Sequence, residues 1–77
     1  MSRFARILHI YGTQVLLLQY YDFELMCHAV EVITQVDDVR EVEVYAFLTQ
    51  EESNHFVREY SLEDAKEFVD SILIQLN

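Results

Sequence analysis

The sequence predicts an α+β fold: an antiparallel β-sheet of four or five strands in meander-like hairpins, with one C-terminal α-helix on one face. Apolar and β-branched runs joined by short polar turns predict the strands. A stripe of apolar residues at helical spacing predicts the helix. The 77 residues include no proline and one glycine, so no linker is visible. We expect one small domain over residues 1–77.

Residues Phe4 to Tyr21 are predicted to form the first hairpin. In the segment Tyr11-Gly12-Thr13-Gln14 the glycine stands at the first central position, as a type II′ turn requires. This turn places four apolar residues on one face, with Ile10 opposite Val15 and Leu8 opposite Leu17. The other face carries Ile7, His9, Leu16 and Leu18.

Residues His28 to Val36 and Arg40 to Leu48 are predicted to form a second hairpin. Both segments are rich in valine, which suits strands. Pairing Thr34 with Val42 gathers the valines on one face and requires an odd-length loop. A two-residue turn at Asp37-Asp38 would mix valines and glutamates on each face, so we disfavour it. The face away from the valines then carries Glu31, Ile33, Gln35, Glu41, Glu43, Tyr45 and Phe47.

Part of this region also permits a helix. Asp22 is a possible N-cap, and helical spacing relates Phe23, Met26, Cys27, Val30 and Ile33. This alternative gives a ββαββα order with a helix at about 22–36. We prefer a strand because β-branched side chains crowd a helix, and this segment contains Val30, Val32, Ile33, Thr34 and Val36.

The last third of the chain contains the clearest element. Thr49 to Asn54 is predicted to be a polar loop, and His55 to Tyr60 is compatible with a short fifth strand. Ser61 to Leu76 is predicted to be a helix, because Ser61 is a good N-cap and Asp64 stands at the capping-box position. Its apolar stripe consists of Leu62, Ala65, Phe68, Val69, Ile72 and Leu76.

The sequence contains no motif for catalysis or metal binding. Cys27 and His28 are adjacent, so in a strand they point to opposite faces and cannot share one tetrahedral ion. No His-x₃-His or Cys-x₂-Cys spacing, phosphate loop or nucleophile elbow occurs. We therefore expect no enzyme, metal or cofactor. A Cys27-dependent enzyme, with His9 or His55 as base, is kept as a third alternative.

The acidic residues are concentrated in one part of the chain. Met1 to Tyr21 contains no Asp or Glu, whereas all fourteen carboxylates lie between Asp22 and Asp70, and the formal net charge is −9. Such a charge repels nucleic acid and anionic membranes and attracts basic proteins. No apolar run approaches the ~20 residues of a spanning helix, and no signal peptide is visible. A cytoplasmic location is expected.

Regularly spaced carboxylates predict a partner-binding surface. Alternate residues on a strand are about 6.6 Å apart and helix neighbours roughly 5–6 Å, comparable with the ~3.4 Å rise per nucleotide in DNA. Aromatic residues among glutamates have the composition of an anchor with a charged rim. Plain solvation of exposed faces, or cover by another element or subunit, explains the same pattern. The predicted partner-binding residues are Glu31, Glu41, Glu43, Tyr45, Phe47, Glu63, Glu67 and Asp70.

In size, charge, lack of catalytic motifs and a sheet followed by one helix, the chain resembles small acidic inhibitors from phages and mobile elements, including anti-CRISPR proteins and DNA mimics. The resemblance is one of general style over the whole chain and assigns no residue. It implies a module that occupies the basic, nucleic-acid-binding surface of a protein partner. The alternative is a structural or regulatory homodimer, because 52% apolar content suits a buried interface and the acidic surface would then only give solubility.

Overall fold

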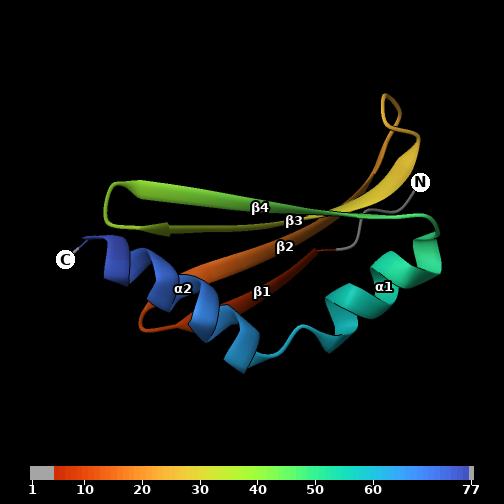
Figure 1. Ribbon diagram of the computed structural model, residues 1–77. Coiled ribbons are helices and arrows are strands. Elements are labelled where there is room, and N and C mark those ends of the chain that lie inside the picture. The colour runs from red at the N-terminus through yellow and green to blue at the C-terminus, as the bar shows by residue number, and fades with distance from the viewer. Residues whose placement is uncertain (1–4, 77) are drawn as a thin grey trace.

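The computed structural model describes residues 5–76, which form a four-stranded sheet covered on one face by two helices (Figure 1). The elements are β1 (Ala5–Ile10), β2 (Thr13–Asp22), β3 (Cys27–Val36), β4 (Val39–Phe47), α1 (Gln50–Glu59) and α2 (Leu62–Leu76). The strands pair antiparallel in the order β1-β2-β3-β4. The predicted α+β meander is confirmed, with two helices in this part of the chain where one was expected.

The first hairpin has the predicted faces in a different register. The two-residue turn Tyr11-Gly12 has positive φ at both positions, 53° and 75°, as a type I′ turn requires. Leu8 therefore pairs with Val15, a shift of two residues from the type II′ register. Because side chains alternate with a period of two, this shift leaves every residue on its predicted face. Phe4 lies outside the described residues.

The second hairpin contradicts the predicted register. Asp37-Asp38 forms the two-residue turn that we disfavoured, with Val36 paired to Val39 and a φ of 54° at Asp37, which Asp tolerates better than most residues. Thr34 consequently pairs with Glu41 instead of Val42. A one-residue shift moves every side chain of β4 to the other face. The helix-covered side of β4 therefore carries Glu41, Glu43, Tyr45 and Phe47.

Residues Cys27–Val36 are a strand, so the alternative helix at 22–36 does not form. Asp22 Oδ1 accepts hydrogen bonds from the backbone N–H groups of Glu24 and Leu25, at 2.9 and 3.0 Å. Asp22 thus closes the loop between β2 and β3 instead of capping a helix. This loop projects beyond the sheet on the side away from α1 (Figure 1), and its tip exposes Phe23, Leu25 and Met26.

The predicted loop at Thr49–Asn54 and strand at His55–Tyr60 were wrong, because α1 spans Gln50–Glu59 with Thr49 as its N-cap and Tyr60 as its C-cap. Thr49 Oγ1 accepts from the N–H of Glu52 at 3.2 Å and donates to its carboxylate at 3.0 Å. These contacts start the helix. The buried residues of α1 are Ser53 and Val57. One of the two is polar, so α1 lacks the apolar stripe by which a helix is recognised in a sequence.

Helix α2 begins as predicted. Ser61 Oγ accepts from the N–H of Asp64 at 3.0 Å, and Asp64 Oδ2 accepts from the N–H of Ser61 at 2.9 Å, which is a reciprocal capping box. Its buried residues are Ala65, Phe68, Val69 and Ile72. They form one core with Val57 of α1 and with the strand residues Leu8, Val15, Leu17, Val30, Val32 and Val36.

Two polar side chains of the sheet hold α1 in place. Gln19, on β2, is buried and donates through Nε2 to Ser53 Oγ and Asn54 Oδ1. The Arg6 guanidinium, on β1, donates to the carbonyl oxygens at the end of α1, those of Val57, Arg58 and Tyr60, at 2.8, 3.2 and 2.6 Å. Within residues 5–76, neither helix is long and apolar enough to cross a lipid bilayer.

Candidate binding groove

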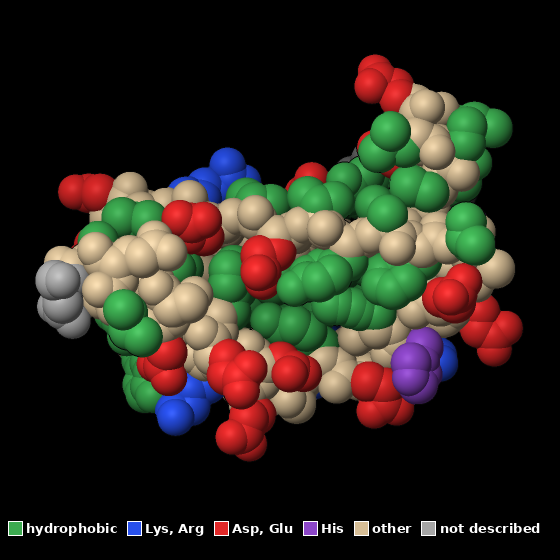
Figure 2. Space-filling view, viewed as in Figure 1, with side chains coloured by type: hydrophobic (Ala, Val, Ile, Leu, Met, Phe, Trp, Pro, Cys, Tyr) green, Lys and Arg blue, Asp and Glu red, His purple; other side chains and the backbone are tan. Residues whose placement is uncertain are grey.

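A groove of about 520 Å³ opens between β4 and the two helices (Figure 2). Helix α2 packs mainly on β1 and β3, and α1 packs on β2, β3 and β4. The middle of the edge strand β4 is therefore left open beside α2. The residues that line this acidic groove are Glu43, Tyr45, Phe56, Glu59, Tyr60, Asp64, Glu67, Phe68 and Ser71.

The floor of the acidic groove is aromatic. Phe56 is its central ring, with Tyr45 at a centroid distance of 4.6 Å and Tyr60 stacked at 5.7 Å. Phe47 meets the same ring edge-on at 5.5 Å. Figure 2 shows this apolar surface in the middle of the molecule with acidic side chains around it. The rings thus form a continuous platform instead of separate exposed residues.

Four carboxylates surround this floor, and no Lys or Arg lines the acidic groove. Glu43 comes from β4, where its carboxylate accepts from the Tyr45 hydroxyl at 3.3 Å. Asp64 is held by the capping box of α2. Glu59 and Glu67 come from α1 and α2. Among all residues 5–76, no group of three or more His, Cys, Asp and Glu side chains has a metal-holding arrangement.

The negative field of the acidic groove acts on two tyrosines. Burial raises the pKa of Tyr60 above its ordinary value of 10.0, and the charges of Glu43, Asp64 and Glu67 raise it further. Burial likewise raises the pKa of Tyr45, followed by the charge of Glu43 and its hydrogen bond. Burial disfavours any charge, but the carboxylate charges, which also disfavour a phenolate anion, favour a cation at the same place.

The structure brings three of the eight predicted partner-binding residues into the acidic groove: Glu43, Tyr45 and Glu67. Phe47 lies beside them against Phe56. Glu41 lies on the same face of β4 outside the groove lining.

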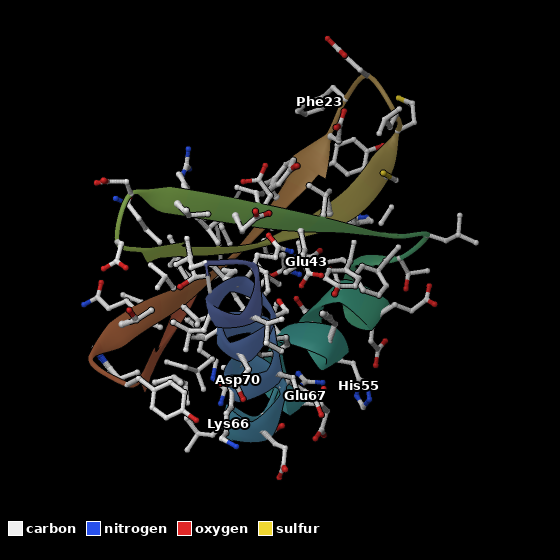
Figure 3. All side chains as sticks on the ribbon, turned by 60° about the vertical axis from the view of Figure 1, so that its left-hand side comes forward. Phe23, Glu43, His55, Lys66, Glu67 and Asp70 are labelled. Carbon is white, nitrogen blue, oxygen red and sulfur yellow. The ribbon has the colours of Figure 1, made fainter. Side chains whose placement is uncertain are left out.

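The other three predicted residues lie elsewhere. Glu31 is on the opposite face of the sheet, where it accepts from the Tyr20 hydroxyl at 3.2 Å. Glu63 is exposed in the first turn of α2. Asp70 is 3.9 Å from Lys66 Nζ, and Figure 3 shows this pair on α2 apart from Glu43 on β4.

Sequence patterns missed six of the nine groove residues: Phe56, Glu59, Tyr60, Asp64, Phe68 and Ser71. Asp64 was interpreted only as a cap and Phe68 only as part of an apolar stripe, and Phe56, Glu59 and Tyr60 fell in the possible fifth strand. The signal that could have found these last three is the Thr49-Gln50-Glu51-Glu52 segment, which matches a capping box. A helix from that point places Phe56 and Tyr60 one turn apart on one side.

The arrangement is suited to holding a cation of a protein side chain. A guanidinium stacks on aromatic rings and pairs with carboxylates at once, because it is planar and carries five donors. The capping box of α2 holds Asp64, and three rings pack around Phe56. Comparisons with protein-family models, with curated proteins and with solved structures found no match.

Proposed function

We propose that this protein is a binding module that receives a basic segment of a partner protein in the acidic groove. The observation that carries this proposal is the convergence of Glu43, Glu59, Asp64 and Glu67 around an aromatic floor. Charge alone would only solubilise the chain, but charge around ordered rings gives both attraction and an anchor. Arginine is the favoured guest, because it pairs and stacks at the same time.

We further propose that the bound basic surface is one that otherwise contacts nucleic acid, so that the module inhibits by steric and electrostatic competition. A net charge of −9 on 77 residues opposes direct contact with phosphates. Glu41, Glu63 and Asp70, outside the groove lining, widen the anionic field that steers a basic partner. In this proposal the carboxylates around the groove bind the basic side chains that would otherwise bind the phosphates of a nucleic acid.

Binding without catalysis is part of the proposal. The acidic groove is lined by neither His nor Cys. Its serine, Ser71, donates its hydroxyl to the carbonyl oxygen of Phe68 at 2.6 Å and not to a carboxylate of the groove. The free thiol of Cys27 is compatible with the reducing cytoplasm, where we place the protein.

Calorimetric titration with an arginine-rich peptide tests the acidic groove. The double variant Glu43→Gln/Glu67→Gln should bind about tenfold more weakly at low salt, since each partly exposed ion pair contributes up to about 1 kcal/mol. Wild-type affinity should fall steeply with salt. The matched control Glu24→Gln/Glu31→Gln removes the same charge from the loop and the opposite face. It should bind nearly as well as the wild type.

Equal weakening in both double variants would mean that net charge alone drives binding. If Glu43→Gln/Glu67→Gln bound the peptide as tightly as the wild type, the acidic groove would be excluded as the binding site. Passing a cell lysate over a column of the immobilised protein tests the nature of the partner. Retained proteins should be released by added DNA or RNA and absent from a column of the groove variant; proteins that nucleic acid cannot displace would contradict the competitive mechanism.

A further inference from the structure

The face of the sheet opposite the helices carries an aliphatic band, and no helix or strand of residues 5–76 packs on it (Figure 1). Beside this band the same face carries a polar row, with the members His9, Gln14, Gln35 and Arg40. The central row of the band crosses all four strands and is entirely aliphatic, with the members Ile7, Leu16, Ile33 and Val42. Ile7 and Val42 are 54% and 41% exposed, and Val44 in the next row is 59% exposed. We call this surface the open face.

Such a surface is unusual for a monomer. A sheet face that meets water normally carries polar side chains at alternate positions, and soluble monomers rarely expose contiguous apolar patches larger than a few hundred Å².

Two charges of opposite sign flank the aliphatic row of the open face, whereas Asp22, on the same face, stands at the far end of β2 and accepts hydrogen bonds from the β2–β3 loop. Along β3, Glu31 lies two residues before Ile33, and along β4, Arg40 lies two residues before Val42. Because the strands are antiparallel, these two charges fall on opposite sides of the aliphatic row. Lys66 with Asp70 is the one ion pair among residues 5–76, so neither Glu31 nor Arg40 has an ionic partner there.

We infer that a second copy of this chain packs face to face on the open face, about a two-fold axis that runs along the aliphatic row. This axis lays the aliphatic row on its own copy. Across this axis the row of Glu31 faces the row of Arg40 in the second copy. Glu31, on β3, then lies over Gln35 of the second copy, and Arg40 of that copy is one strand away, about 4.8 Å to the side and within reach of a long guanidinium. A two-fold interface contains each contact twice, so both glutamates and both arginines gain a diagonal partner.

Size and charge support this occupant. Four strands of six to ten residues cover roughly 550 Å² in projection, near the ~800 Å² of accessible surface that each partner buries in a standard interface. Two sheets packed in this way keep both helix layers outside. The strongly anionic sides of the two copies are then as far apart as the fold permits, which limits their repulsion.

Sedimentation equilibrium across the micromolar range tests the pairing. The wild type should show a dimer that dissociates on dilution. Glu31→Lys and Arg40→Glu should each raise the dimer dissociation constant about tenfold, because each places like charges at this diagonal contact. The double variant Glu31→Lys/Arg40→Glu should dimerise again. Glu24→Lys, in the β2–β3 loop, is the matched control and should change little.

Mixing the two single variants gives a second, independent result. Each lacks a partner in its own dimer, but the introduced lysine of one meets the introduced glutamate of the other, so the mixture should form a heterodimer. This arm also shows that both single variants are folded. A wild type that stays monomeric, single variants that dimerise normally, or a mixture and double variant that both stay monomeric would each overturn the inference.

Discussion

Arg6 shows how one residue positions the candidate site from a distance. Its guanidinium donates to the carbonyl oxygens of Val57, Arg58 and Tyr60. The last carbonyls of a helix lack intrahelical partners and carry the negative end of its dipole. Arg6 satisfies them from the opposite end of the sequence. No local pattern around Arg6 could predict this role, because its partners are more than fifty residues away.

Replacing Arg6 by methionine should lower the free energy of unfolding by about 2 kcal/mol, since charge-assisted hydrogen bonds of a partly buried group are lost. Denaturant unfolding monitored by circular dichroism measures this change. Lys66→Met removes an equal charge from an exposed pair with Asp70 and should cost under about 0.5 kcal/mol. Similar losses in both variants would mean that Arg6 acts only through net charge.

Groove residues differ in how far the sequence could predict them. Tyr45 and Glu43 stand out by composition, since an aromatic residue alternates with glutamates along a strand. Tyr60 does not, because it enters the acidic groove only where α1 ends. Its place depends on Arg6 and on the length of α1, both of which are properties of the tertiary structure.

At the scale of elements, β4 explains the error in register. Alternation along a strand identifies two faces, but it does not say which face meets the helices. Val42 and Val44 were expected on the same face as Val30 and Val32, yet they lie on the open face. Edge position resolves the conflict, because Glu41 and Glu43 on the covered side still reach solvent beside α2. Register is normally indicated by apolar residues on one face of a strand and polar residues on the other. In β4 the valines lie on the open face and the glutamates on the covered face, so this indication pointed to the wrong register.

The two helices contrast in the same way. Helix α2 has a long apolar stripe after Ser61 and was predicted from it. In α1 a polar residue, Ser53, occupies a buried position. It is tolerated there because its hydroxyl donates to the carbonyl oxygen of Gln50 and accepts a hydrogen bond from Gln19. A satisfied buried serine behaves as a core residue without looking like one. Only the cap at Thr49 signals this helix locally.

The cap of α1 is therefore a sharp test at this scale. Thr49→Ala should lower the free energy of unfolding by about 1 kcal/mol, the usual value for a lost N-cap. It should also loosen the Phe56 platform and weaken peptide binding. Thr49→Ser keeps the capping oxygen and should retain both properties. Chemical denaturation and peptide titration measure them, and equal losses for serine and alanine would rule out the cap.

The whole molecule has two unlike sides that share one sheet. The helix side carries the acidic groove, and the open face carries the aliphatic row. The acid-free segment that ends at Tyr21 supplies β1 and all of β2 except Asp22, and its residues serve both the core and the open face. The sequence thus predicted the kinds of surface present, whereas their assignment to sides needed the register of β4.

Because the two sides are separated by the sheet, the two proposed contacts should be independent. Glu31→Lys should weaken the dimer while peptide affinity per chain stays within about twofold. Glu43→Gln/Glu67→Gln should weaken peptide binding and leave the dimer intact, since sites without shared partners contribute additively. Sedimentation with labelled peptide measures both quantities in one sample and should show one peptide per chain in the dimer.

Coupling between the two measurements would contradict this separation. If peptide binding dissociated the dimer, the peptide would be competing for the open face. If the dimer-weakening variant lost peptide affinity in proportion, a site formed by both copies would be required instead. If the two contacts are independent, each dimer has two acidic grooves on opposite outer sides. Such a dimer can bind two basic partners at once. One short peptide cannot occupy both grooves, because it cannot span the distance between them.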